Sequence, residues 1–415
     1  MNQKDKVNGK AIKDVDLLPN SQKYILGFQH TLAMFGATIL VPILTGLHVS
    51  VALFASGIGT LLFHYLTKNK VPAYLGSSFA FIAPITLVVD KFGIPAAQGG
   101  VIVAGLIYGI VALLIYLIGP GLIKRVFPPI VTGPVIIVIG LNLAPTAIDQ
   151  ASGSVANIIV AASALIAAGI VSVFSKGFLK IIPVIVGLVT GYIVAVLAGI
   201  VDFTPIMEAR WLGLPEFTAP TINWEAISLI APIAVVSMVE HVGDILSIGV
   251  TVGKGNEYLE DPGIHRTMLG DGLATALAGL FGGPPNTTYG ENTGVLALTK
   301  VYDPKVMKIG AGFALIMALV QKIGGFIETI PEPVIGGISI LLFGMIATIG
   351  IRTLVENKVD LKKQRNLIIS ATILVLGLGG AVFSLWELEF SGMALGAIVG
   401  IILNLVLPEE ISSKK

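Results

Sequence analysis

The sequence has no cysteine and few charged residues. Without cysteine, the 415-residue chain can form no disulfide bond and carry out no thiolate chemistry, and its redox compartment cannot be inferred. Asp, Glu, Lys and Arg make up 12% of the residues, whereas a soluble domain carries about 25%. The formal net charge of +1 argues against a nucleic-acid-binding protein that relies on positive charge. These absences exclude an ordinary soluble protein.

Apolar residues and glycine dominate the composition. Hydrophobic residues account for 54% of the chain, and its mean hydropathy is +0.90. The 49 glycines suit membrane helices, which pack closely through small residues. Residues 1–23 are polar and predict a solvated tail, and no cleavable signal precedes the first long apolar run. We therefore expect an all-α polytopic membrane protein.

Fourteen apolar runs predict fourteen transmembrane spans, since a span needs about 20 residues. The third and tenth runs are shorter, follow prolines and open with small polar residues. Interrupted spans in corresponding positions of two halves are typical of transporter binding sites, so short extended (β) segments are expected in both. The runs are 24–46, 50–67, 74–89, 97–118, 128–147, 155–174, 181–201, 225–248, 264–281, 287–299, 306–327, 333–351, 366–385 and 390–407.

The positive charges predict the orientation of these spans. With the amino terminus in the cytoplasm, 23 of the 26 Lys and Arg residues fall on the inner side, and Lys91, Arg210 and Lys322 fall outside. One missed or extra span would break this pattern from that point onward. The positive-inside rule therefore favours fourteen spans in the plasma or inner membrane, with both termini cytoplasmic.

A repeat is visible at an offset of 203 residues (324 − 121). Seven spans per half is an odd number, so the two halves are expected to be inverted relative to each other. Inverted repeats with broken helices suit alternating-access transporters better than receptors or structural proteins. The first set of matching residues is Gly121, Pro128, Val131 and Gly133, and the second is Gly324, Pro331, Val334 and Gly336.

Two carboxylates and a histidine interrupt the apolar eighth span. Ionisable groups at bilayer depth cost about 2.5–3.5 kcal/mol each, so they persist mainly along substrate or ion pathways. Glu240 and Asp244 are four residues apart and share one helix face. Two such charges cannot comfortably both ionise in a low dielectric, so one is expected to bind a proton near neutral pH. His241 lies off this face and is more typical of a packing or hydrogen-bonding residue than of a ligand.

A third carboxylate, Glu291, lies at the start of the helix predicted in the tenth span. The extended stretch 286–289 before it leaves backbone N–H groups free at the helix start, where they can donate to a ligand carbonyl. Glu291 would accept from ligand N–H groups. This combination complements a small planar ring with both N–H and C=O on its edges. The third span has the same design at 74–79 but lacks the acid.

Motifs in spans one, three, eight, nine and ten form a distinctive set. They are Gly27-Phe28-Gln29-His30 with Ala33-Met34-Phe35-Gly36-Ala37-Thr38, Pro72-Ala73-Tyr74-Leu75-Gly76-Ser77-Ser78-Phe79-Ala80, Glu240-His241-Val242-Gly243, Leu269-Gly270-Asp271-Gly272-Leu273-Ala274-Thr275, and Asn286-Thr287-Thr288-Tyr289-Gly290-Glu291-Asn292 with Gly294 and Thr299-Lys300. This set resembles the nucleobase–ascorbate transporter family, most closely its bacterial uracil permeases. The resemblance covers essentially the whole chain, and the span-ten motif is highly specific.

The resemblance implies two interleaved domains and a homodimer in the lipid bilayer. Spans 1–4 and 8–11 would form a core domain, and spans 5–7 and 12–14 a gate domain. In residue numbers, the expected parts are a tail at 1–23, core at 24–118, gate at 119–201, core at 202–328, gate at 329–407 and a tail at 408–415.

The resemblance also implies uracil bound between the interrupted spans. Glu240 and Glu291 would bind the ring, backbone at Phe79 and Gly290 would donate to its carbonyls, and Tyr289 and Phe343 would make apolar or stacking contacts. Purine-selective relatives tend to have glutamine in place of Glu291, so this site favours uracil. A uracil-transporting relative has histidine at the position of Asp244, which leaves the proton-coupling residue open among Asp244, Glu240, Asp271 and His241.

The function expected from the sequence is uracil import with a proton, with no cofactor and no metal site. A purine carrier for xanthine or uric acid, another nucleobase symporter, and coupling to Na⁺ remain alternatives. An anion exchanger should have a basic residue at the midplane, where this chain has acids. An intramembrane aspartyl protease using Asp244 and Asp271 lacks the required Gly-x-Gly-Asp motif, so an enzyme is not expected.

Overall fold

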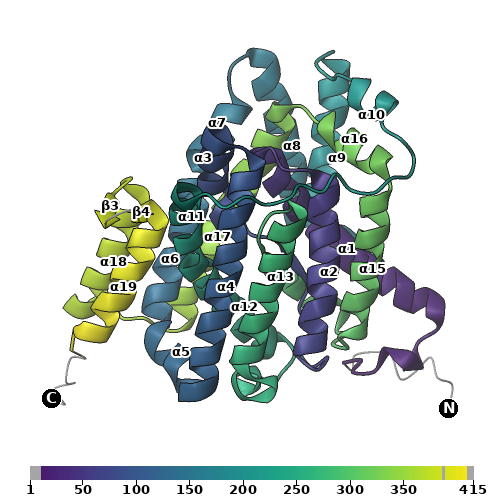
Figure 1. Ribbon diagram of the computed structural model, residues 1–415. Helices are drawn as coiled ribbons and strands as arrows, with labels where there is room; N and C mark the ends of the chain where they lie inside the picture. Colours follow the sequence, from purple (N-terminus) through teal and green to yellow (C-terminus); the bar gives the residue numbers. More distant parts are fainter. Residues whose placement is uncertain (1–10, 386–387, 409–415) are drawn as a thin grey trace.

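The computed structural model describes residues 11–385 and 388–408, which form a helical bundle with two short two-stranded sheets (Figure 1). The helices in chain order are α1 (Asn20–Thr45), α2 (Val49–Leu66), α3 (Ile82–Phe92), α4 (Ile94–Ile118), α5 (Gly121–Val126), α6 (Pro129–Asn142), α7 (Ala144–Ala151), α8 (Val155–Phe174), α9 (Pro183–Leu197), α10 (Thr204–Glu208), α11 (Trp224–Ile230), α12 (Ala234–Thr251), α13 (Ile264–Phe281), α14 (Gly290–Thr299), α15 (Lys305–Leu319), α16 (Gln321–Glu328), α17 (Glu332–Glu356), α18 (Gln364–Leu378) and α19 (Gly392–Val406). The strands are β1 (Leu75–Ser77), β2 (Asn286–Thr288), β3 (Val382–Leu385) and β4 (Leu388–Ser391).

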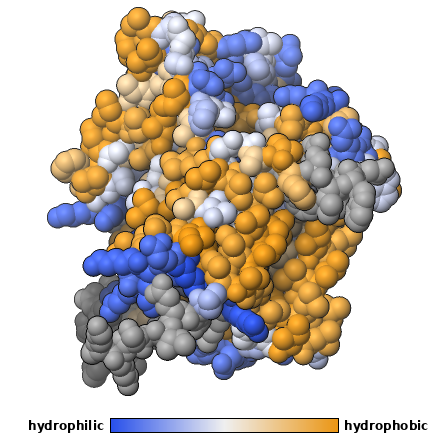
Figure 2. All heavy atoms as spheres, turned by 90° about the vertical axis from the view of Figure 1, so that its left-hand side faces the viewer, coloured by the Kyte–Doolittle hydropathy of each residue, from blue (hydrophilic) through white to orange (hydrophobic). Residues whose placement is uncertain are grey.

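The helices have the length and composition of a multi-pass membrane protein. Within the described residues, seven helices are long and apolar enough to cross a membrane, or eight if the bent pair α15–α16 forms one span. Three apolar helices, α9, α18 and α19, are shorter, so the number of fourteen spans stays a prediction. Figure 2 shows a broad apolar band on one face, with hydrophilic side chains gathered toward both ends. Such a band suits contact with lipid.

Strands β1 and β2 interrupt the third and tenth runs, as the sequence predicts. They pair antiparallel, with Leu75 opposite Thr288 and Ser77 opposite Asn286. Each strand is followed by a short helix, α3 or α14. The pairing brings together two segments that lie more than 200 residues apart in the sequence, and it places the starts of both short helices inside the bundle.

The structure adds detail to the expected spans in two places. The run 306–327 is bent, because α15 ends at Leu319 and α16 turns away by 76°, and the pair has the length and composition of one broken span. The runs 366–385 and 390–407 are not helical throughout, because residues 382–385 and 388–391 form the β3–β4 hairpin. Val382 and Phe383 belong to residue types enriched in strands, but the apolar composition of this run does not distinguish a strand from a helix end.

Part of the amino-terminal segment is docked against the bundle, although most described residues of the predicted tail are exposed. Ile12 N–H donates to the Lys300 carbonyl at 2.8 Å, and Val15 N–H donates to an oxygen of Asp303 at 2.9 Å. Val15 is buried. Residues 1–10 and 409–415 of the two predicted tails lie outside the described residues. The start of α1 and the end of α19 lie at the same end of the bundle as α5, opposite α10 and α16 (Figure 1).

Close helix packing holds these elements together. At the crossing of α4 and α13, a Cβ on Gly105 would lie 2.6 Å from the Gly272 carbonyl oxygen, and a Cβ on Gly272 would lie 2.4 Å from the Cβ of Tyr108. Only glycine lets the two backbones approach this closely. The α13 helix, which carries Asp271, is therefore held in place beside β2.

Candidate functional site

The start of α14 is the centre of the candidate site. Its N-cap residue, Tyr289, has extended backbone (φ −99°, ψ 120°) and makes no side-chain capping hydrogen bond. The first backbone N–H groups of a helix have no partner within the helix. Glu291 follows in the first turn, and both Gly290 and Glu291 are half-buried. The helix start therefore offers N–H donors and a carboxylate acceptor side by side.

The α12 helix brings two further carboxylates to this helix start. α12 packs against α14, and the Oδ1 atom of Asp244 lies 3.1 Å from the position that a Cβ on Gly290 would occupy. Glu240 lies one turn before Asp244 on α12, and Glu291 directly follows Gly290 on α14. The Oε2 atom of Glu240 is buried and has no hydrogen-bond partner among the described residues. The structure thus brings together the three acids on which the sequence prediction depends.

None of these three acids forms an ion pair with Lys or Arg in the described part of the chain. A buried carboxylate without a cation is costly unless it binds a proton or accepts hydrogen bonds. The cluster of Glu240, Asp244 and Glu291 is therefore chemically suited to bind protons and ligand N–H groups. It is poorly suited to bind an anion.

An aromatic pair lies between span 3 and span 12. Phe79 lies two residues after the end of β1, and Phe343 lies in α17. Their ring centroids are 6.0 Å apart with an interplanar angle of 78°, and both side chains are almost fully buried. Edge-to-face packing of this kind stabilises contacts between elements. Phe79 and Phe343 therefore link the β1 strand to α17.

Tyr289 points back toward the first strand. Its hydroxyl donates to the Ser77 carbonyl at 2.8 Å, and the Thr38 hydroxyl donates to the Tyr289 oxygen at 3.4 Å. The ring covers Gly76, where a Cβ would lie 2.5 Å from ring atoms. The Tyr289 hydroxyl therefore links span 10 to span 3 by a hydrogen bond, in addition to any contact that the ring makes with a ligand.

His241 and Asp271 form a separate, fully buried pair. The Nδ1 atom of His241 lies 2.7 Å from Oδ2 of Asp271, and Nε2 lies 3.0 Å from the Thr267 hydroxyl. Asp271 also accepts from the backbone N–H of Thr288 at 3.0 Å and from its hydroxyl. His241 is thus a hydrogen-bonding residue, as its position on the helix predicts. Its carboxylate partner is Asp271.

The sequence also predicts that His30 ties the first span to its neighbours, and the structure confirms this, but sequence reasoning missed its partner Asn292 and the roles of Thr267 and Thr288. The Asn292 amide donates to the His30 carbonyl at 3.0 Å and lies 3.1 Å from His30 Nδ1, which ties α14 to α1. Asn292 directly follows Glu291 in the span-ten motif, so its position was a signal. Thr267 gave no signal, because a threonine in an apolar helix usually bonds its own backbone.

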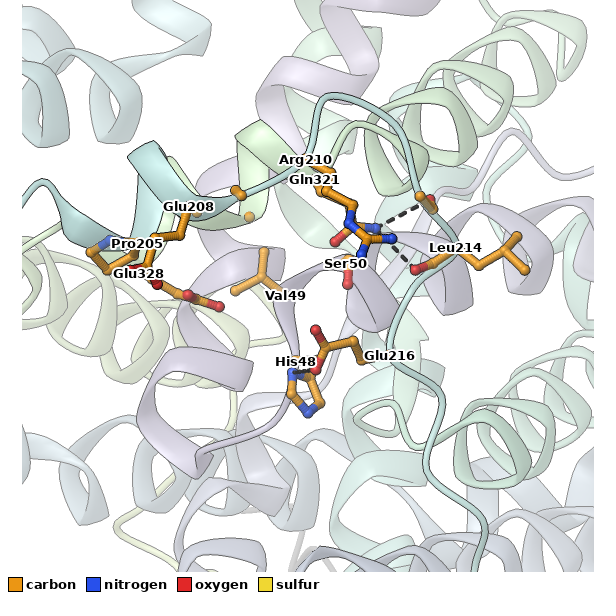
Figure 3. Close-up of a pocket in the computed structure, with 14 residues that line it drawn as sticks. His48, Val49, Ser50, Pro205, Glu208, Arg210, Leu214, Glu216, Gln321 and Glu328 are labelled. Atoms are coloured by element: carbon orange, nitrogen blue, oxygen red, sulfur yellow. Dashed lines mark hydrogen bonds and ion pairs between the residues drawn. The ribbon is translucent and has the colours of Figure 1, made fainter.

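A separate cavity lies away from the three acids, at the end of the bundle that carries α10 and α16. It has a volume of about 530 Å³ and lies among α2, α10, α16 and the segment 209–216 (Figure 3). The Nδ1 atom of His48 lies 3.6 Å from Oε2 of Glu216. The Gln321 amide donates to the carbonyls of Gly213 and Leu214. None of the three acids lines this cavity, so its chemistry is separate from the candidate site.

Comparison with solved structures defines the class of fold. The transmembrane domain of a cyanobacterium bicarbonate transporter, BicA, superposes with a TM-score of 0.58 at 17% identity, covering 94% of this chain and 98% of that one. A murine anion transporter, Slc26a9 in the inward-facing state, gives a TM-score of 0.68 at 11% identity, covering 93% of this chain and 68% of that one. The fold is that of a membrane transporter.

Sequence comparison then identifies the family. The model named Xan_ur_permease, described as "Permease family", matches residues 21–385, and the chain belongs to that family. It is 47% identical to the uracil permease of Bacillus caldolyticus, covering 96% of this chain and 95% of the relative. It is 45% identical to the uracil permease of Bacillus subtilis (98% and 96%) and 43% identical to that of Escherichia coli K12 (97% and 96%). The predicted resemblance is confirmed, and the chain is a permease, not an enzyme.

Proposed function

We infer that this permease imports uracil together with a proton by alternating access. The similarity to uracil permeases supports the substrate. The observation that carries the proposal is the convergence of Glu240, Asp244 and Glu291 on the open helix start at Gly290. This arrangement has acceptors for the ring N–H groups and donors for the ring carbonyls.

The size of uracil makes such complementarity necessary. A ceiling of about −1.5 kcal/mol per non-hydrogen atom limits its binding free energy to about −12 kcal/mol. Micromolar affinity needs about −8.2 kcal/mol. Most polar groups of the ring must therefore be matched, and hydrogen bonds to the charged groups Glu240 and Glu291, worth about 1.5–3 kcal/mol each, would contribute most. Phe79, Tyr289 and Phe343 would enclose the ring.

Alternating access would use relative movement of a core and a gate domain. In this proposal the core contains spans 1–4 and 8–11, and the gate spans 5–7 and 12–14, arranged as two inverted seven-span repeats. The sharp bend between α15 and α16 falls within the proposed core, before its boundary with the gate at residue 329. The Phe79–Phe343 contact would lie on the boundary between the moving parts. A homodimer in the cell membrane, with both termini cytoplasmic, completes the proposed arrangement.

The proton would be carried within the cluster of acids. Glu240 and Asp244 are one turn apart, so protonating one removes repulsion between them. Moving the unprotonated pair across the boundary would incur a desolvation cost of several kcal/mol. Asp244 is the favoured carrier because its carboxylate lies against Gly290, next to the ligand. Glu240 is one alternative, because it belongs to the same cluster. Asp271 and His241 are the others, since they form a buried pair connected to β2 through Thr288.

Uptake by proteoliposomes tests this function. Labelled uracil should accumulate against its gradient when the outside is acidic, and should only equilibrate when the pH gradient is collapsed. Competition with xanthine, uric acid and other nucleobases tests the alternative substrates, and replacing the pH gradient with a Na⁺ gradient tests the alternative ion. Absence of uracil uptake with intact uptake of a purine would contradict the substrate assignment.

A further inference from the structure

The β1–β2 sheet has two open edges within a membrane protein. Each strand pairs with the other on one side only, because the sheet contains two strands. Backbone N–H and C=O groups without partners cost several kcal/mol each at bilayer depth, so the outer edges need other partners. Both edges are fully buried.

Two threonines bond the open edges in the same way. The Thr60 oxygen in α2 accepts from Leu75 N–H at 3.0 Å, and its hydroxyl is 3.4 Å from the Leu75 carbonyl oxygen. The Thr275 oxygen in α13 accepts from Asn286 N–H at 3.2 Å, and its hydroxyl donates to the Asn286 carbonyl at 2.8 Å. A hydroxyl can donate and accept at once, so one threonine satisfies both backbone groups of one strand residue.

The residue one helical turn before each threonine also bonds a strand, at the same strand residue for Thr60 and at the other end of the strand for Thr275. Four residues before Thr60, the Ser56 hydroxyl donates to the Leu75 carbonyl at 2.6 Å. Four residues before Thr275, Asp271 accepts from Thr288 N–H. Leu75 and Asn286 are the first residues of their strands and lie at opposite ends of the ladder. The two edges are therefore related by an approximate twofold axis through the sheet.

We propose that Thr60 and Thr275 are a matched pair of positioning residues that hold β1 and β2 in register and so set the geometry of the substrate site. This inference rests on the proposed function. Shifting a strand by one residue would turn every side chain to the opposite face. Each threonine opposes such a slip because it binds the N–H and C=O of a single residue. The strands lead within two residues to Phe79 and Gly290, where the proposed backbone donors lie.

The hydroxyls can be removed with little change in shape. In Thr60→Val and Thr275→Val, uracil should bind at least about fivefold more weakly by calorimetric titration, because the first change leaves the Leu75 N–H unpaired and the second leaves both backbone groups of Asn286 unpaired. Thr60→Ser and Thr275→Ser keep the hydroxyl and should restore affinity to within about twofold. The double valine variant should lose less affinity than the product of the single losses, because both threonines act on one sheet.

Thr67→Val is the matched control. Thr67 ends α2 and is fully buried, but its hydroxyl donates only to the Phe63 carbonyl of its own helix at 2.8 Å. The Thr67→Val variant should keep wild-type uracil affinity, even if its melting temperature falls as much as that of Thr60→Val or Thr275→Val. Should a valine variant not fold, Thr60→Ala or Thr275→Ala replaces it, with the same expected loss. Wild-type affinity in the folded hydroxyl-free variants, or equal losses in Thr67→Val, would overturn the inference. A wild-type chain that does not bind uracil would instead contradict the proposed function.

Discussion

The two interrupted spans share one backbone plan and differ in their chemistry. In both, a three-residue strand is anchored by a threonine from a neighbouring helix and leads into a short helix with an open start. In span 3, a 3₁₀ turn at Phe79–Phe81 leads into α3, and the turn and the start of α3 are both apolar. In span 10, α14 opens with Gly290 and Glu291, beside Glu240 and Asp244 of α12.

This difference suggests how a repeated plan becomes a specific site. Both helix starts can supply N–H donors, because those groups are part of the backbone. The acceptors are side chains, and they are concentrated at α14. To recognise a ring with both N–H and C=O groups, the site would then use backbone donors from both spans. The charged acceptors would come only from the surroundings of span 10. The following predictions are ordered by their expected effect on uracil affinity.

Removing either glutamate should erase the chemical difference between the spans. We expect Glu291→Ala and Glu240→Ala each to weaken uracil binding at least about tenfold, the value of one charge-assisted hydrogen bond. Calorimetric titration of the folded variants measures the loss. Glu225→Ala is the control, because Glu225 is also a first-turn glutamate but is exposed on α11. Unchanged affinity in either variant would remove that glutamate from the site.

Glu291→Gln should reduce the chemical difference between spans 3 and 10, because it removes the charge and keeps a polar group. A carboxylate only accepts hydrogen bonds, whereas the glutamine amide both donates and accepts. Uracil uptake should fall several-fold, and discrimination against oxidised purines such as xanthine should relax. Competition across a panel of nucleobases measures the change. An unchanged profile would show that selectivity depends on pocket volume.

Asp244→Asn separates binding from coupling. The amide mimics a protonated carboxyl beside Gly290, so uracil affinity should stay within several-fold of wild type and uracil–uracil exchange should continue. Accumulation driven by a pH gradient should be lost. Proteoliposomes loaded with and without uracil distinguish the two activities. Wild-type accumulation in this variant would transfer the coupling role to Glu240, Glu291 or the Asp271–His241 pair.

The exposed ion pairs of the amino-terminal segment should tolerate change. Asp16 pairs with Lys305 and, at 3.1 Å, with Lys23, and these hydrogen bonds lower the pKa of Asp16. Since the folded-state pKa is the lower one, the pairing stabilises the fold above the unfolded-state pKa and is lost as pH falls through the folded-state pKa. Asp16→Asn should change uracil affinity by less than about twofold, as expected for exposed ion pairs. Its melting temperature should differ from wild type at neutral pH and converge with it in acid. A difference that persisted in acid would contradict this account.

Much of the site followed from the sequence because its signals are local. Glu240 and Asp244 stand out in an apolar run, and their four-residue spacing places them on one helix face. The prolines and small polar residues before Phe79 and Glu291 predict interrupted spans. The β3–β4 hairpin and the bend after Leu319 were missed, because an apolar run gives the same signal for a strand, a bent helix and a straight one.

The sequence by itself determined that this chain is a membrane protein, where its spans are interrupted and which acids lie within them, because each of these depends on the composition of a short segment. Tertiary structure decided which partners those residues have. Asp271 binds His241 and Thr288, Tyr289 reaches Ser77, and Thr60 and Thr275 secure the two strand edges. These contacts join residues far apart in sequence, so no local pattern specifies them. They form because a buried polar group must find a partner wherever the packed helices provide one.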